Sequence, residues 1–355
     1  MVMTVRLNDR IGGHSPWVLC EDTDLMQVPP ALLECVCYIE VNDHLMGTGF
    51  FLGYPLNPGG EGPQRFVYVT TARHVIELDE AMIARIGAPE KITLRINTRD
   101  GGFGRVETSP DDWVRHPGAD LAMTPLAPDI QVFDYHHFPT EGMLNVEVID
   151  RLGLWVGAET LTPGLLVNQP GISQVQPVVR FGHVAGLGTD PVKMKVAPGL
   201  VVEDNAILIE GKSLGGVSGA PVFVHVDDWR RDANGVIQPL TFTGFAGTTG
   251  PNYLLGLVHG FFGALENEVP TPEREFMRQM NSGIQIVVPW SRIEGLLQHP
   301  DLVGKRRKEK EEFDIGNMPE ALSIAADESD TIALTAELMG KLLQASKDEI
   351  MKDQS

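Results

Sequence analysis

Residues 211–223 read GKSLGGVSGAPVF, and the motif G-x-S-G-x-P within them centres on Ser218 and runs directly into an apolar strand signal. Glycines around a serine favour a tight turn, because glycine adopts backbone conformations that other residues avoid. Such a turn brings backbone N–H groups close to a reacting carbonyl. The stretch therefore predicts a serine nucleophile on a turn before a β-strand. Ser213 is a weaker alternative, because it lacks the flanking glycines and the proline.

Two upstream motifs supply a base and an acid in a suggestive order. His74 lies in the run T-T-A-R-H-V, and Asp120 lies in A-D-L-A. The gaps are 46 residues (120 − 74) and 98 residues (218 − 120). A serine hydroxyl needs a base to take its proton, and histidine titrates near neutral pH. A carboxylate behind the imidazole would fix its tautomer. Three other aspartates compete for this acid role, but only Asp120 has the Leu-Ala continuation: Asp111, Asp112 and Asp134.

Together the three motifs resemble those of the chymotrypsin/trypsin-like serine peptidases. That family carries T-A-x-H around its base, D-[IL]-A around its acid and G-x-S-G-x-P around its nucleophile, with gaps of roughly 45 and 93 residues. The resemblance implies that His74 is the general base, Asp120 orients it and Ser218 attacks. It also implies that the backbone N–H groups of Gly216 and Ser218 form the oxyanion hole. The implied reaction is hydrolysis of peptide bonds through an acyl-enzyme, without metal or organic cofactor.

One residue departs from the pattern of the secreted enzymes, and the specificity pocket is only suggested by analogy. Val217 replaces the aspartate that pairs with a freshly cut N-terminus, so no activation switch of that type is expected. The resemblance places substrate-binding residues just before the nucleophile and on a later strand: Lys212, His259, Gly260 and Phe261. A cation at Lys212 would favour an acidic side chain, with His259 assisting. The alternative is that Lys212 points to solvent, as most lysines do.

Many short strand signals separated by turns favour an all-β sandwich or barrel. Regular alternation with long helices, which would indicate an α/β fold, is absent. The resemblance narrows this prediction to two antiparallel six-stranded β-barrels of the chymotrypsin type, with the site in the cleft between them. A short helix is expected in 76–85 and a terminal helix at 289–297. Strands are predicted at 32–41, 46–53, 66–71, 91–98, 145–149, 161–168, 176–184, 200–209, 222–226, 253–258 and 283–288.

The domain boundaries follow from these patterns. Residues 1–30 are expected to be an irregular N-terminal extension, 31–300 the double-barrel protease domain, and 301–355 a charged linker and helical tail. The linker is assigned to 301–330, and apolar residues at helical spacing in 331–351 predict an amphipathic helix. This helix either packs back on the barrels or docks a partner protein. The sequence does not decide between the two.

Composition limits the class of protein and its partners. The chain has 355 residues and a net charge of −20, the opposite of the basic surface that a nucleic-acid-binding protein needs. No apolar run approaches a membrane span, and the first ten residues lack the apolar core of a signal peptide. Its three cysteines, Cys20, Cys35 and Cys37, lack histidines at zinc-ligand spacing, so we expect buried free thiols in a reducing compartment. The protein is therefore expected to be cytoplasmic.

The sequence thus predicts a trypsin-like serine endopeptidase, a hydrolase whose substrate is another protein or peptide. The alternative is a catalytically silent protease fold whose cleft binds a peptide without cutting it. The intact set of three residues favours the enzyme. An esterase of the α/β-hydrolase type is disfavoured, because that fold orders its residues Ser, Asp, His.

Overall fold

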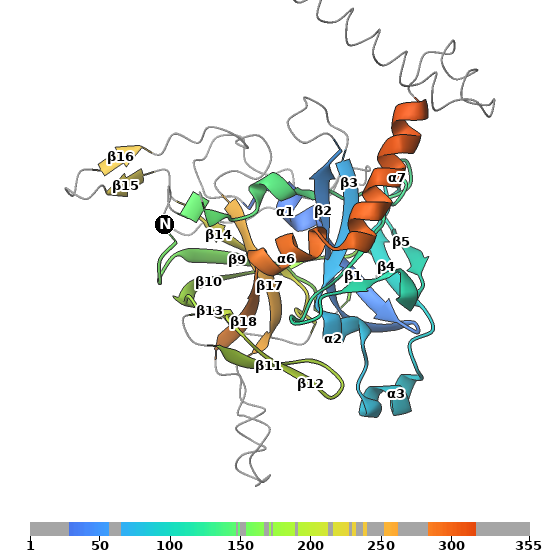
Figure 1. Cartoon of the computed structure of the whole chain (residues 1–355), viewed down its shortest axis with the longest axis horizontal. Coiled ribbons are helices and arrows are strands. Elements are labelled where there is room, and N and C mark those ends of the chain that lie inside the picture. The colour runs from blue at the N-terminus through green and yellow to red at the C-terminus, as the bar shows by residue number, and fades with distance from the viewer. Residues whose placement is uncertain are drawn as a thin grey trace, which may run out of the picture. The chain divides into compact units, whose positions relative to one another are not determined.

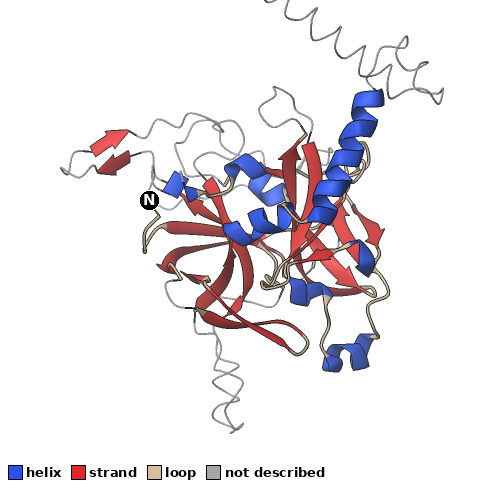
Figure 2. Cartoon of the chain, viewed as in Figure 1, coloured by secondary structure: helices blue, strands red, loops and turns tan. Residues whose placement is uncertain are grey.

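Runs of β-branched and aromatic residues form the strands of this protein, because such side chains pack well on a pleated surface. The computed structural model has strands from many such runs, together with fewer helices (Figure 2). The described residues are 28–56, 65–146, 148–149, 154–166, 170–171, 173–188, 191–211, 216–226, 229–231, 237–239, 252–261 and 283–316.

The N-terminal half builds an eight-stranded sheet, called the first sheet here. Its order is β5-β4-β1-β2-β3-β7-β6, with β8 pairing in parallel with β2. The β1–β2 hairpin turns through Asn42 and Asp43, both with positive φ, as a two-residue hairpin turn requires. The strands are β1 (Val36–Val41), β2 (His44–Pro55), β3 (Arg65–Thr71), β4 (Ile92–Asn97), β5 (Phe103–Thr108), β6 (Val114–Arg115), β7 (Ala122–Pro125) and β8 (Phe138–Pro139).

The C-terminal half builds a closed barrel in the order β10-β13-β18-β17-β14-β9, called the second barrel here. In Figure 1 it is the green-to-orange group of strands beside the blue and cyan first sheet. Two hairpins, β11–β12 and β15–β16, stand outside it. The strands are β9 (Glu159–Gly164), β10 (Val178–Gly186), β11 (Val192–Ala197), β12 (Leu200–Asp204), β13 (Ile207–Glu210), β14 (Pro221–His225), β15 (Trp229–Arg231), β16 (Ile237–Pro239), β17 (Asn252–Phe261) and β18 (Ile284–Pro289).

The expected all-β fold of the chymotrypsin type is confirmed, with one difference between its halves. Antiparallel ladders close the second barrel into a ring, whereas those of the first sheet run from β5 at one end to β6 at the other among the described residues. Apolar packing joins the two halves: the rings of Phe138 and Phe223 lie 4.9 Å apart, centroid to centroid. The core of the first sheet continues into β17, β18 and the helix after them. This shared core fixes the two halves against each other where the candidate site lies.

Helices occupy the connections. The predicted short helix at 76–85 is present as two pieces, α2 and α3, and the terminal helix after Pro289 is present as α6. Asp79 caps α3 by accepting a hydrogen bond from the N–H of Met82 at 2.9 Å. The helices are α1 (Pro30–Glu34), α2 (Arg73–Ile76), α3 (Glu80–Ile86), α6 (Trp290–Leu297) and α7 (Pro300–Gly316), with 3-10 turns η1 (Pro110–Asp112) and η2 (Thr140–Gly142).

Three segments differ from the sequence prediction. The strand predicted from residue 32 starts at Val36, because α1 occupies residues 30–34 with proline at its first position. The strand predicted at 145–149 is a helical turn, in which the Asn145 side chain accepts a hydrogen bond from the N–H of Val148. The part of the charged linker at 301–316 is helical and belongs to α7. In each case a local cap or a run of helix formers outweighs the pattern.

The chain divides into two compact units, 1–302 and 303–355. The predicted extension at 1–27 and the predicted amphipathic helix at 331–351 lie outside the described residues. Cys35 and Cys37 are buried free thiols, as expected, and burial raises the pKa of both. Cys20 lies outside the described residues. No helix in the described part of the chain is long and apolar enough to cross a membrane.

Candidate active site

His74 is positioned by the end of β3 and the single turn of α2. The strand ends at Thr71, whose hydroxyl donates to the main-chain carbonyl of Thr48 at 2.8 Å. Ala72 keeps an extended backbone, and the helix begins at Arg73. This bend turns the imidazole toward Asp120. The main-chain N–H of His74 donates to Asp120 Oδ1 at 2.9 Å, and His74 Nδ1 lies 2.7 Å from Asp120 Oδ2.

Asp120 is fully buried in the loop before β7. Burial alone would raise the pKa of its carboxyl. The charge of His74 and the hydrogen bonds from two imidazoles oppose this, and the pKa lies well below its usual range. In return, Asp120 holds the pKa of His74 above its ordinary value, although burial of the ring opposes the rise. The pair therefore favours an ionised carboxylate facing an imidazole of strengthened basicity.

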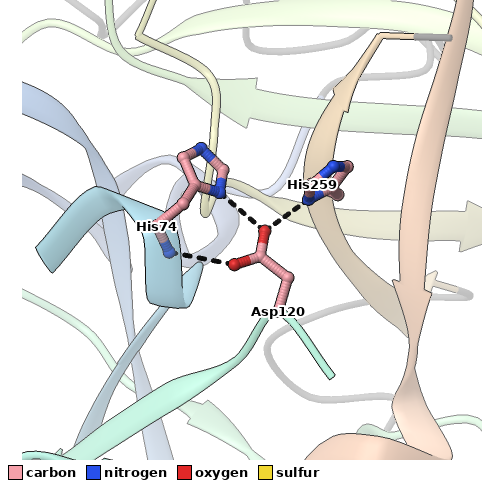
Figure 3. A group of neighbouring side chains, drawn as sticks. All are labelled: His74, Asp120 and His259. Carbon is pink, nitrogen blue, oxygen red and sulfur yellow. Dashed lines mark hydrogen bonds and ion pairs between the residues drawn. The ribbon is translucent and has the colours of Figure 1, made fainter. Parts of the chain in front are cut away.

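A second imidazole shares the same carboxylate. His259 Nδ1 lies 2.5 Å from Asp120 Oδ2, on the side of the carboxylate opposite His74 (Figure 3). The two imidazoles meet edge to face, with ring centroids 5.4 Å apart. Asp120 thus accepts three hydrogen bonds, one on Oδ1 and two on Oδ2. The sequence indicated His259 only as a substrate-binding residue, and this contact was not expected.

Ser218 lies on a tight turn before β14. Glycine is required just after it, at Gly219, where φ is +83° and an added Cβ would lie 2.2 Å from the carbonyl oxygen of Thr48. The N–H of Ala220 closes the turn by donating to the carbonyl of Val217 at 2.9 Å. Gly216 also has a positive φ, +104°. The turn expected from the glycines is therefore present, and it presents Ser218 at the edge of the second barrel.

Thr48, from β2 of the first sheet, holds this turn. Its hydroxyl donates to the carbonyl of Gly216 at 2.7 Å, and its N–H donates to the carbonyl of Ser218 at 2.9 Å. The same hydroxyl accepts a hydrogen bond from the N–H of Leu165 at 3.1 Å. Thr48 is completely buried. One residue of the first sheet thus fixes the backbone on both sides of Val217, and sequence patterns gave no signal for it.

The hydroxyl of Ser218 donates to the main-chain carbonyl of His259 at 3.2 Å, and this is its one hydrogen bond to the described residues. Within the same described part of the chain, no acceptor is bonded to the N–H of Gly216 or of Ser218. These two amides are the donors that the sequence assigned to the oxyanion hole. They are available to an incoming carbonyl oxygen.

His74, Gly216, Ser218, His259 and Gly260 line one cavity of about 480 Å³. The first sheet and α2 provide one wall, and the β11–β12 hairpin reaches it through residues 195–198. A cavity of this size can hold a peptide side chain together with part of its backbone. His74, with Asp120 hydrogen-bonded behind it, therefore lies around the same cavity as Gly216 and Ser218.

The remaining predicted residues are less well defined. Lys212 lies outside the described residues, and so does its competitor Ser213. Phe261 ends β17, but its side chain is outside the described part of the structure. The competing aspartates Asp111 and Asp112 belong to η1 at the exposed surface. The substrate-binding roles of Lys212, His259, Gly260 and Phe261 stay predictions.

His74, Asp120 and His259 also form a group whose ligand atoms lie within 4.8 Å of one another, as a metal site requires. The two nitrogens are 2.7 and 2.5 Å from the same carboxylate oxygen. Neighbouring ligand atoms around tetrahedral zinc lie about 3.3 Å apart, since zinc–ligand bonds are about 2.0–2.1 Å long. The arrangement found here is therefore that of imidazoles hydrogen-bonded to a carboxylate.

No protein-family model matches this chain, and no curated protein matches it. Solved structures do resemble it. The protease domain of MamO from Magnetospirillum magneticum is 15% identical over 76% of this chain and 98% of its own length, with a TM-score of 0.42. The inactive form of Rv3671c protease is 16% identical over 76% and 89%, with a TM-score of 0.38. Its active form, from M. tuberculosis, is 14% identical over 79% and 93%, with a TM-score of 0.36. At values this low, the fold is assigned from the strand pairings described above.

Proposed function

We propose that this protein is a serine endopeptidase that hydrolyses peptide bonds of protein substrates through an acyl-enzyme. The observation that carries the proposal is the pairing of the buried Asp120 with His74, which lines the same cavity as Ser218. A hydroxyl nucleophile is activated by an imidazole base that a carboxylate holds in place from behind. The raised pKa of His74 supports a role as proton acceptor.

In the proposed reaction, His74 Nε2 takes the proton of the Ser218 hydroxyl as Oγ attacks the carbonyl carbon of the substrate. Asp120 stabilises the imidazolium that results. The negative oxygen of the tetrahedral intermediate binds the N–H groups of Gly216 and Ser218. His74 then returns the proton to the leaving amine, and the C–N bond breaks. Water then attacks the acyl ester while His74 takes its proton. The Ser218 oxygen leaves with that proton, and the carboxylic acid product is released.

This mechanism requires the Ser218 hydroxyl, which donates to the carbonyl of His259, to turn toward His74 Nε2. Side-chain rotation between staggered positions is fast. Catalytic hydrogen bonds are often long or misdirected before substrate binds. The resting geometry is therefore compatible with an active enzyme.

The same contact favours a second candidate, a protease fold that binds peptides without cutting them. If the Ser218 hydroxyl stays on the carbonyl of His259, it has no base and cannot be activated. The cavity and the N–H groups of Gly216 and Ser218 would still bind an extended peptide. The two candidates differ in one measurable property, the reactivity of Ser218.

A fluorophosphonate probe tests this property, because it labels only activated serines. We expect the full-length protein to be labelled at Ser218, and Ser218→Ala to lose the label while keeping its fold by circular dichroism. His74→Ala should lose it as well. A folded wild-type protein that resists labelling and still binds peptides would reject the endopeptidase in favour of the binding protein. Cleavage of a peptide library would then define the preferred side chain.

A further inference from the structure

We propose that His259 is a positioning residue of this site, which fixes the carboxylate of Asp120 through its ring. The inference rests on the proposed function, because it assigns a role within that site. The ring of His259 is 14% exposed, and its Nδ1 lies 2.5 Å from the carboxylate oxygen that also contacts His74. Its carbonyl accepts the hydroxyl hydrogen bond of Ser218 at 3.2 Å. One residue therefore contacts both the acid and the nucleophile.

The backbone explains why this side chain points inward. The pairing of β17 with β18 shifts between Val258 and Gly260, so that His259 is the extra residue of a β-bulge. A bulge bends its strand and redirects the side chain of the inserted residue. Val258 is the residue before it. The carbonyl of Val258 accepts from the N–H of Gly219 at 2.8 Å, and its N–H donates to the carbonyl of Ala220 at 2.9 Å. The bulge is thus tied directly to the turn that carries Ser218.

The chemistry of the contact gives His259 its role. A carboxylate oxygen that accepts two Nδ1–H donors cannot rotate without losing one of them, so His259 fixes the plane of Asp120 and with it the ring of His74. The two donors also share one negative charge, so removal of the His259 donor leaves more of that charge to His74. The other titratable groups that line the cavity around them are Glu77, Asp79 and Lys195.

Two substitutions separate the hydrogen bond from the shape of the side chain. In His259→Asn the amide nitrogen takes the place of Nδ1 and keeps a donor that does not titrate. In His259→Leu the donor is lost while much of the volume remains. We expect Leu to lower kcat about tenfold to hundredfold with little change in KM, since a hydrogen bond to a charged group is lost. Asn should stay within about threefold of the wild type.

The pH profile adds a measurement that a purely structural role would not move. In His259→Leu the carboxylate keeps only one imidazole donor, so its charge acts more fully on His74, which holds its proton to higher pH. The acid limb of kcat/KM should therefore shift to higher pH in His259→Leu and stay close to the wild type in His259→Asn. A Leu variant with wild-type kcat, or an acid limb that coincides in Leu and wild type, would overturn the proposal.

A second readout does not depend on activity. In the full chain labelled with ¹⁵N-histidine, the protons on Nδ1 of His74 and His259 should give two resonances shifted downfield by hydrogen bonding to the carboxylate. His259→Asn should remove one, and Asp120→Asn should move both. A single downfield resonance in the wild type would reject the shared carboxylate. Two resonances in a protein that resists the fluorophosphonate would reject the endopeptidase and leave the His259 contact in place.

Discussion

The two halves of the candidate site differ in how completely they are bonded. Asp120, in the first sheet, accepts three hydrogen bonds of 2.5–2.9 Å. Among the described residues, the Ser218 hydroxyl, at the edge of the second barrel, makes one hydrogen bond of 3.2 Å, to the carbonyl of His259 in its own barrel. Two hydrogen bonds of the acid–base pair join α2 to the loop before β7 within the first half of the fold, and His259 adds a third from the second barrel. The nucleophile depends on contacts between the two halves of the fold, and Thr48 supplies two of them.

Breaking the acid–base half should have the largest effect. Asp120→Asn keeps the shape of the side chain but replaces one acceptor oxygen with an NH2 donor, which then faces either the main-chain N–H of His74 or the two ring nitrogens. We expect kcat to fall on the order of 10⁴-fold, as it does when the triad aspartate of a serine peptidase is replaced by asparagine. Steady-state cleavage of a peptide substrate measures kcat for both proteins. Circular dichroism serves as the control for folding, and a kcat within tenfold of the wild type would remove Asp120 from the proposed mechanism.

The local structures around His74, Asp120 and Ser218 were predictable from sequence. The motifs around His74 and Asp120 lie on local structure, a strand end with a helical turn and a short loop, so residue pattern alone indicates them. The turn of Ser218 was equally clear, because glycines with positive φ flank it. Sequence reasoning therefore indicated the His74–Asp120 pair and the turn at Ser218, whose catalytic roles stay predictions, and it predicted the all-β class, which is confirmed.

The contacts that link the halves were not predictable. Thr48 lies in an ordinary strand, and its hydrogen bond to Gly216 joins residues 168 positions apart. The inward turn of His259 depends on a bulge in the ladder between β17 and β18, which no alternation pattern reveals. The helical turn after Asn145 was read as a strand, because a short apolar run cannot distinguish the two. Long-range register is set by the fold as a whole.

Loosening the nucleophile half should have a smaller effect. Thr48→Val replaces the hydroxyl with a methyl group and leaves the carbonyl of Gly216 and the N–H of Leu165 without this partner. The backbone between the two oxyanion donors then loses its support, and we expect kcat to fall about tenfold to hundredfold. Thr48→Ser, which keeps the hydroxyl, is the matched control and should stay within about threefold. Equal activities for Val and Ser would show that the inter-sheet bond does not position the turn.

The smallest effect concerns pH and stability, and it separates the two members of the acid–base pair by sign. The pKa of Asp120 is depressed in the folded state, so its contribution to the free energy of unfolding is present above the ordinary carboxyl pKa and is lost as pH falls below it. The pKa of His74 is raised, so its contribution is present below the ordinary imidazole value of 6.5 and is lost as pH rises through the higher folded value.

Urea unfolding of the wild type and His74→Gln across this range will test the second statement. We expect the free energy of unfolding of the wild type to exceed that of His74→Gln most between the two ordinary pKa values, where the carboxylate is ionised and the imidazole is protonated. The difference between the two proteins should decline as pH rises above 6.5. Asp120→Asn should remove this decline, because the raised pKa of His74 depends on the neighbouring carboxylate. A difference that instead grows with pH would mean that burial, and not Asp120, dominates the titration of His74.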